Sequence, residues 1–448
     1  MDVASRYAAA LLTESGADEL AAEPPRAAPL HPAHAWARSG AMELTGWPDA
    51  APRLAPGPLA SCAAGAALAL ARLAGPAFPA GLDGAALLGE RAALAGLGRR
   101  GTLAPGGGCR LLRAADGWIA VSLVRADDWA LLPAWLSLAA AEGAWEAVAD
   151  ALRAIGADDA VARARLLGLA AAVAGPLPRV SPPWRRVAAR GPRRARAPGA
   201  APRVLDLSSL WAGPLCAHLL GLAGAHVVKV ESASRPDGAR RGSEAFFDLL
   251  HAGQASAVLD LSTRSGGERL RRLAARADVV VESARPRALR QLGVDAEALV
   301  AETPGLVWVS LTGYGRSGPG ENWVAYGDDA AVAAGLARAT GEPEAAPLFC
   351  GDAIADPLAG LHASVSALAA FRAGEAVLLD VALRDVAAHA ARFAEGARDA
   401  RVRRANGGFE VVADGRSEPV LAPRARRPAG RARPRGADTP AVLRALAG

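Results

Sequence analysis

The stretch Arg203–Glu231 reads RVLDLSSLWAGPLCAHLLGLAGAHVVKVE and decides the fold of the chain around it. A short apolar run, 204–207, leads into the turn AGP at 212–214, then into apolar positions at helical spacing, and then into a second apolar run, 227–230. This order predicts a strand, a helix and a parallel strand. Because proline suits the first turn of a helix and glycine permits close approach, the turn is a candidate anion site. It equally fits an ordinary first crossover of a doubly wound sheet, since no GxGxxG accompanies it.

Strands and helices alternate regularly beyond this stretch. Further strands are expected at 256–261, 278–282, 306–311 and 376–381, and helices at 214–223, 265–276, 287–292, 328–339 and 357–372. Such alternation is typical of a parallel sheet with helices on both faces. The predicted fold class is therefore α/β, a doubly wound parallel sheet with a Rossmann-like core at 203–400 and a smaller α+β domain.

The smaller domain is expected at 99–175. Within it, 110–113 and 118–123 predict a β-hairpin around a turn at Asp116-Gly117, followed by helices at 129–141, 144–155 and 159–172. Residues 1–98 predict short helices. The Pro/Arg-rich segment 176–202 predicts a linker, and 401–448 an extended carboxy-terminal arm.

Composition excludes some classes of protein. The chain has 448 residues, 52% of them hydrophobic and 21% charged, which is ordinary for a globular protein and not for a disordered one. The net charge is +6, but the excess arginines have no interleaved aromatic residues, so nucleic-acid binding is not indicated. Four well-separated cysteines predict neither a zinc site nor a disulfide framework. Without a signal-like or membrane-spanning segment, we expect a soluble cytoplasmic protein.

The two halves of the chain echo each other. ASRYAAALLTESGADEL from Ala4 is similar to AGPLCAHLLGLAGAHVV from Ala212, and LASCAAGAAL from Leu59 is similar to IADPLAGLHA from Ile354. Residues 1–98 can thus be interpreted as a degenerate, shortened copy of the second half that lacks the βαβ core. The alternative is chance similarity between alanine-rich helices.

The second half resembles the family III CoA-transferases, the group that includes formyl-CoA and carnitine CoA-transferases and, as a relative, α-methylacyl-CoA racemase. The resemblance rests on the opening stretch and on four later blocks in the family's order: SAVLDLSTRSGGERLRRLAARADVVVESARPRALRQLGV, LVWVSLTGYGRSGPG, ADPLAGLHASVSALAAFRAG and LLDVALRDVAA. In the family the smaller domain lies inside the core, whereas here it precedes the core. The chain therefore resembles a rearranged or fused form with a degenerate first half.

The resemblance implies a nucleophile at Asp356, four residues before Gly360 in IADPLAG. A carboxylate, with an ordinary pKa near ~3.9, is ionised at neutral pH and needs no base to attack a thioester. Asp followed by Pro357 also fits a helix N-cap, and both roles are compatible. In the first-half copy the matching position is Ser61, which implies that this half is catalytically silent.

The family's CoA contacts also carry over by position. They imply a CoA site formed by Trp211, Ala212, Leu259, Asp260, Leu261, Ser262, Ser283, Ala284, Arg285 and Asp328. Lys229, the one lysine of the chain, stands at an expected strand end, where either a phosphate contact or a structural role is open.

Three functions follow as hypotheses. The first is a CoA-transferase that moves CoA from an acyl-CoA donor to a carboxylic acid through an aspartyl-CoA thioester, without a permanently bound cofactor or metal. The second is an acyl-CoA racemase using Asp328 or Asp329, with His251 or His362 as partner. The third is a catalytically weak acyl-CoA-binding subunit. The resemblance further implies a homodimer or an internally fused pseudo-dimer.

Overall fold

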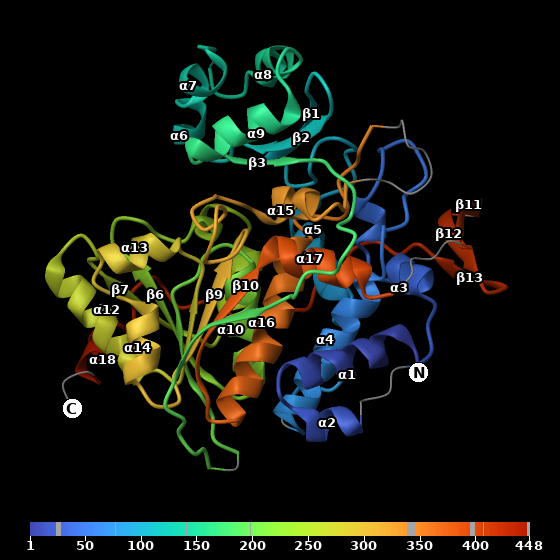
Figure 1. Cartoon of the computed structure of the whole chain (residues 1–448). Coiled ribbons are helices and arrows are strands. Elements are labelled where there is room, and N and C mark those ends of the chain that lie inside the picture. The colour runs from blue at the N-terminus through green and yellow to red at the C-terminus, as the bar shows by residue number, and fades with distance from the viewer. Residues whose placement is uncertain are drawn as a thin grey trace.

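The computed structural model describes residues 1–23, 28–76, 78–139, 141–197, 199–337, 346–394, 399–405 and 407–445. Its centre is a seven-stranded sheet in the order β4-β10-β9-β8-β5-β6-β7 (Figure 1). Six strands are parallel, as expected: β5 (Arg203–Asp206), β6 (His226–Ser232), β7 (Ala255–Leu259), β8 (Val279–Glu282), β9 (Val307–Thr312) and β10 (Ala376–Ala382). The predicted α/β class is confirmed.

Helices cover both faces of this sheet. In β8, Val279 and Val281 join the core beneath α10 (Ala212–Leu222) and α16 (Ala355–Arg372), whereas Val280 joins the core on the opposite face. Successive residues of a strand point to opposite faces, so a strand buried on both sides reads as a continuous apolar run. The opposite face is covered by α12 (Arg264–Arg276), α13 (Pro286–Gln291) and α14 (Ala296–Glu302).

Three further helices of the second half complete the first face and the edge above it. They are α11 (Glu244–His251), α15 (Gly327–Ala333) and α17 (Leu383–Arg392), with a single 3-10 turn, η3 (Gly238–Arg241), before α11. The helix expected at 328–339 ends at Ala333, and its positions 338–339 lie outside the described residues.

The amino-terminal stretch packs onto the α16 face and shares its hydrophobic core. Its elements are α1 (Val3–Glu14), α2 (Asp18–Ala22), α3 (Pro32–Arg38), η1 (Met42–Leu44), α4 (Leu59–Ala74), η2 (Ala86–Gly89) and α5 (Glu90–Ala95). Helices α1 and α4 approach closely because Gly65 has no side chain. A Cβ at this position would lie 2.5 Å from the Ala4 carbonyl oxygen. The stretch is therefore built against the sheet domain and is not a free extension.

The smaller α+β unit lies above the sheet (Figure 1). The predicted hairpin is confirmed as β1 (Cys109–Arg113) and β2 (Trp118–Ser122), followed by α6 (Ala126–Trp129), α7 (Leu132–Leu136), α8 (Trp145–Leu152) and α9 (Ala157–Leu166). The helix expected at 159–172 is wrong in its last part: Gly168, at φ +80°, ends it, and β3 (Ala170–Val173) pairs with β2. Alanine favours helices, so only this pairing reveals the strand.

Two further expectations need correction. Within the expected linker, β4 (Arg186–Gly191) pairs antiparallel with β10, and its side chains are mostly exposed because it is an edge strand. Within the expected arm, β11 (Arg401–Ala405), β12 (Gly408–Ala413) and β13 (Arg416–Pro419) form a small antiparallel sheet, and α18 (Thr439–Arg444) follows. Both segments are rich in arginine and proline, which hides their short strands. None of the described helices is long and apolar enough to cross a membrane.

Candidate active site

A cleft opens at the carboxyl ends of β5, β8 and β9. The chain runs from β5 outward to β6 and β7 and then returns to β8 beside β5, so the strand order reverses between β5 and β8. Ligands of doubly wound sheets bind at such a reversal. The cleft encloses about 770 Å³, open solvent included. Its lining comes from the turns after these strands, from the segment 321–326 and from the starts of α16 and α17.

Helix α10 begins in this cleft, as the opening stretch predicts. Gly213 must be glycine because a Cβ there would lie 2.2 Å from the Cβ of Ser208. Leu210, which lines the cleft, has a φ of +72°, an unusual conformation for a residue with a side chain. The turn thus brings the amino-terminal end of an eleven-residue helix against the cleft wall, where its dipole favours an anion.

Asp356 lines the same cleft and is partly exposed. The N-cap interpretation is wrong: Ile354 is the N-cap of α16, and Asp356 stands in the first turn. The preceding Ala353 has a φ of +42°, and its carbonyl oxygen accepts the Asp356 N–H at 2.9 Å. At the start of α15, a Cβ on Gly327 would lie 2.4 Å from Asp356 Oδ2, so only a glycine leaves room for this carboxyl group.

Two more carboxyl groups and one guanidinium surround Asp356. Asp328 accepts the Ala353 N–H at 2.8 Å, and the fully buried Asp352 is clamped by Arg91, whose Nε lies 2.7 Å from Asp352 Oδ2. The pKa of Asp356 is raised to about 7: burial raises it most, Arg91 and a hydrogen bond from the Gly327 backbone lower it, and the charges of Asp328 and Asp352 add to the rise. Burial also raises the pKa of Asp328. The pKa of Asp356 therefore lies close to neutral pH.

The sequence-predicted site residues divide into three groups. Ala212, Ser283, Ala284, Arg285 and Asp356 line the cleft together. Trp211 is buried behind the lining as the N-cap of α10, and Asp328 borders Asp356 from α15. The remaining four, Leu259, Asp260, Leu261 and Ser262, lie at the end of β7, two strands away from β5 along the same edge of the sheet.

Several site residues carried no signal in the sequence. Trp323 and Tyr326 line the cleft from an irregular segment, and Glu321 does so beside them. Arg91 and Asp352 are 261 residues apart in the chain, so no local spacing links them. Only the GYGRSGPG block before residue 321 marks a functional loop in this region.

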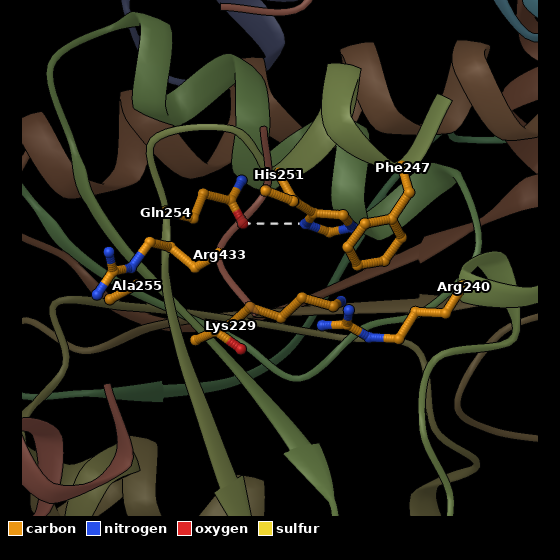
Figure 2. A pocket seen from close by; sticks show the side chains of 9 residues that line it. Lys229, Arg240, Phe247, His251, Gln254, Ala255 and Arg433 are labelled. Carbon is orange, nitrogen blue, oxygen red and sulfur yellow. Dashed lines mark hydrogen bonds between the residues drawn. The ribbon is translucent and has the colours of Figure 1, made fainter. Parts of the chain in front are cut away.

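The two histidines proposed as racemase partners lie elsewhere. His251 is part of a separate small pocket, where its Nδ1 is 3.0 Å from Gln254 Oε1 (Figure 2). His362 is fully buried, with Nε2 2.6 Å from the hydroxyl oxygen of Tyr7. Within the described part of the chain, no histidine lines the cleft.

Lys229 also borders the small pocket of Figure 2. It is 2% exposed and ion-pairs with Asp237 at 3.0 Å and with Asp206 at 3.4 Å. Lys229 thus stands inside β6 and not at its end, and of the two roles left open its contacts fit the structural one. Lys229 is a buried cation that neutralises two buried carboxylates.

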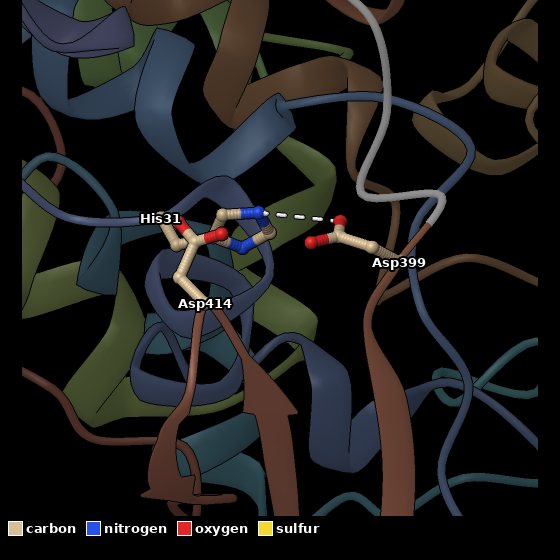
Figure 3. Close-up of side chains that lie close together, drawn as sticks. All are labelled: His31, Asp399 and Asp414. Carbon is tan, nitrogen blue, oxygen red and sulfur yellow. Dashed lines mark ion pairs between the residues drawn. The ribbon is translucent and has the colours of Figure 1, made fainter.

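One other cluster has the composition of a metal site. His31, Asp399 and Asp414 present ligand atoms within 4.8 Å of one another (Figure 3). However, the Ala33 N–H donates to His31 Nδ1, so the neutral ring carries its proton on Nε2, the atom 3.6 Å from Asp399. A protonated nitrogen cannot ligate a metal, and the cluster fits a helix cap with two carboxylates beside it.

Sequence comparison identifies the family of this region. Residues 201–421 match the pattern of CoA-transferase family III. Over this region the chain belongs to CoA-transferase family III, and the resemblance noted from the sequence is confirmed. The succinate–glutarate CoA-transferase of Agrobacterium fabrum is 35% identical over 202 residues, which cover 41% of this chain and 50% of that protein.

Other relatives match the same part of the chain. The succinyl-CoA–D-citramalate CoA-transferase of Chloroflexus aurantiacus is 32% identical over 192 residues, covering 40% of this chain and 48% of that protein. The chain thus spans about half the length of the curated relatives it matches. A solved CAIB/BAIF family protein from Brucella suis is 29% identical, covering 48% of this chain and 65% of that chain, with a TM-score of 0.42.

Proposed function

We propose that this protein is a CoA-transferase that moves CoA from an acyl-CoA to a carboxylic acid, with Asp356 as the nucleophile. The observation that supports this most is the position of Asp356: its carboxyl group lines the cleft at the strand-order reversal, opposite the start of α10. Membership of the family over 201–421 and relatives named as CoA-transferases support the same reaction.

The chemistry requires four balanced steps. An Asp356 oxygen attacks the thioester carbonyl, and the CoA thiolate leaves, giving a mixed anhydride. The thiolate then attacks the aspartyl carbonyl, releasing the donor acid and leaving an aspartyl-CoA thioester. The acceptor carboxylate attacks this thioester and expels the thiolate, and the thiolate finally attacks the acceptor carbonyl of the new anhydride. Product acyl-CoA leaves, and Asp356 is again a free carboxylate.

The charges along the sheet edge suit an extended anionic ligand. The start of α10 and the guanidinium of Arg285 would take the phosphates of CoA beside the cleft. Leu259–Ser262 lie along the same edge at the end of β7, where the far end of so long a ligand would reach. CoA is then a substrate, and the reaction calls for no permanently bound cofactor.

Substrates with small carboxylic acids fit this proposal. The two CoA-transferase relatives are named for succinate and glutarate and for succinyl-CoA and D-citramalate. We expect the same class here, a short acyl-CoA donor and a short mono- or dicarboxylic acceptor, with succinyl-CoA as the first donor to try.

The racemase alternative receives less support. Burial raises the pKa of Asp329 to about 7, a suitable value for a general base. Yet Asp329 is fully buried, and neither it nor Asp328 lines the cleft. A racemase also needs a second acid–base group facing the first, and among the described residues of the cleft no histidine fills that role.

The proposal also covers the division of the chain into segments and the number of chains in the assembly. We expect a cytoplasmic homodimer or internally fused pseudo-dimer in which 1–98 is a degenerate half-copy, 99–175 the smaller domain, 176–202 the connection, 203–400 the working core and 401–448 the carboxy-terminal segment. Light scattering after size exclusion measures the number of chains, and neither nucleic acid nor a membrane is expected as a partner.

The test is trapping of the covalent intermediate. The protein is incubated with a panel of acyl-CoAs, beginning with succinyl-CoA, and its intact mass is measured before and after hydroxylamine. A CoA-sized adduct that maps to Asp356 and is absent from Asp356→Asn is expected. CoA binding without an adduct from any thioester would reject the transferase in favour of a racemase or a binding subunit. Uptake of solvent deuterium at the α-carbon then separates those two.

A further inference from the structure

Arg91 reaches the candidate active site from a part of the chain outside the family region. It lies in α5, within the first hundred residues, yet its guanidinium contacts Asp352 in the segment before α16. We propose that Arg91 is a positioning residue of the Asp356 site, so that the amino-terminal stretch completes the site within one chain. This rests on the proposed role of Asp356 as the nucleophile.

The guanidinium is held on several sides. Both Nε and Nη2 donate to the carboxylate of Asp352, a two-point contact that fixes the plane of the group. The ring of Trp211, the N-cap of α10, lies 5.4 Å from the guanidinium carbon. A Cβ on Gly106 would lie 2.8 Å from Nη2, so the glycine turn after α5 packs directly on the guanidinium. Arg91 thereby connects the α5 region, the α10 start and the Asp352 segment.

Helix α5 is anchored independently of Arg91. The neighbouring Glu90 is 1% exposed and receives a bidentate contact from Arg426, whose Nη1 lies 2.8 Å from His218 Nε2 on α10. These contacts hold α5 between α10 and the carboxy-terminal segment. Removal of the Arg91 charge therefore leaves the helix in place, although it deprives the buried Asp352 of its ion-pair partner.

The charges that face Asp356 explain what Arg91 does. Asp328 on α15 and Asp352 before α16 are the carboxyl groups whose charges act on Asp356, and Glu321 lines the cleft; Arg91 and the cleft-lining Arg285 are the cations. Arg91 opposes the effect of these two carboxyl groups on Asp356. Without it, proton release from Asp356 would compete with two uncompensated negative charges, and the attacking carboxylate would form at higher pH.

The experiment compares Arg91→Gln, Arg91→Lys and Gly106→Ala with the parent protein. The rate of CoA-adduct formation is measured with saturating succinyl-CoA, or the panel's best donor, as a function of pH. The rate is expected to rise with pH as Asp356 loses its proton, and this rise is called the acidic limb of the pH profile. In Arg91→Gln the midpoint of the acidic limb should lie about one pH unit higher. The rate near pH 7 then falls about fivefold, and it recovers at higher pH. Arg91→Lys, which keeps the charge, should lie between, and Gly106→Ala should move the limb in the same direction by displacing the guanidinium.

Arg99→Gln is the matched control. Arg99 follows in the same stretch and also pairs with a carboxylate, Glu43, but away from the cleft. The Arg99→Gln substitution should leave the acidic limb of the pH profile where it is in the parent protein. An Arg91→Gln limb that coincides with the parent limb, or a pH-independent loss that Arg91→Lys does not relieve, would overturn the proposal.

A direct titration separates this proposal from the proposed function. The carboxyl carbon of Asp356 is followed by carbon NMR in aspartate-labelled protein, with Asp356→Asn to assign its signal. A higher titration midpoint in Arg91→Gln supports the role of Arg91 even if no thioester forms an adduct. An unchanged midpoint rejects it, whether or not the protein is a transferase.

Discussion

Gly327 offers the sharpest test of the geometry around Asp356. Replacing it with alanine would place a Cβ 2.4 Å from Asp356 Oδ2 and 2.4 Å from the Ala353 carbonyl oxygen. The carboxyl group must give way, and the Ala353 carbonyl, part of the backbone at φ +42°, must shift as well, which costs stability. The substitution therefore changes the position of the nucleophile without changing its chemistry.

The magnitude follows from the contacts. Ordinary contacts of a Cβ begin near 3.4 Å, so Asp356 Oδ2 must move by roughly 1 Å. A misplacement of that size lowers the rate of a well-oriented reaction by about 100-fold. The same overpacking lowers the free energy of unfolding by about 1–3 kcal/mol, which leaves a large protein folded. We expect a large loss of adduct formation with a small loss of stability.

The assay measures adduct formation under single turnover together with thermal unfolding. Gly221→Ala in α10 is the matched control, because its Cβ would meet Val227 Cγ2 at 3.6 Å, an ordinary contact. It should form the adduct at the parent rate. A Gly327→Ala protein that forms the adduct as fast as Gly221→Ala would refute the placement of the Asp356 carboxyl group.

Three further substitutions test other parts of the structure. Burial raises the pKa of Asp329 to about 7, so the stability that its protonated form provides is present at low pH and is lost as pH rises through about 7. In urea titrations, the free energy of unfolding of Asp329→Asn should rise relative to that of the parent by about 2–3 kcal/mol between about pH 5 and pH 8. A difference between the two proteins that does not change with pH would contradict the burial of that carboxyl group. Lys229→Met leaves the buried carboxylates of Asp206 and Asp237 without their cation, and should lower the free energy of unfolding by about 3–5 kcal/mol. An unchanged denaturation midpoint would be incompatible with the buried pairs. Arg285→Gln should raise KM for acyl-CoA roughly tenfold at low salt, and less at high salt; an unchanged KM at low salt would remove Arg285 from the CoA site.

Much of the core could be predicted from the sequence because its strands are buried on both faces. All six residues of β9 are buried, and four of them, with Leu306 before them, are apolar, so the strand stands out in the sequence. The edge strand β4 could not be predicted, since most of its side chains face solvent and two of its six residues are arginine. β3 is an alanine-rich segment that becomes a strand only through its pairing with β2.

The site residues likewise divide into those that a local sequence pattern predicts and those that only the three-dimensional structure brings together. Asp356 and the turn at 212–214 stand in local patterns, a helix start and a strand–helix turn, and both lie at the cleft. Arg91 lies in a short helix with no motif around it, and its relation to Asp352 exists only in three dimensions. Long-range pairs of this kind leave no spacing that a single sequence can display.

The most direct measurement follows oxygen from the acceptor acid into Asp356. Attack by an acceptor carboxylate on the aspartyl-CoA thioester, followed by attack of CoA on the acceptor carbonyl, leaves one acceptor oxygen in the Asp356 carboxylate. The protein is therefore turned over with succinyl-CoA, or the best donor of the panel, and with the corresponding acid labelled with oxygen-18, and the peptide containing Asp356 is weighed. Label in Asp356 is the predicted result. Turnover that leaves Asp356 unlabelled would contradict its role as the covalent nucleophile.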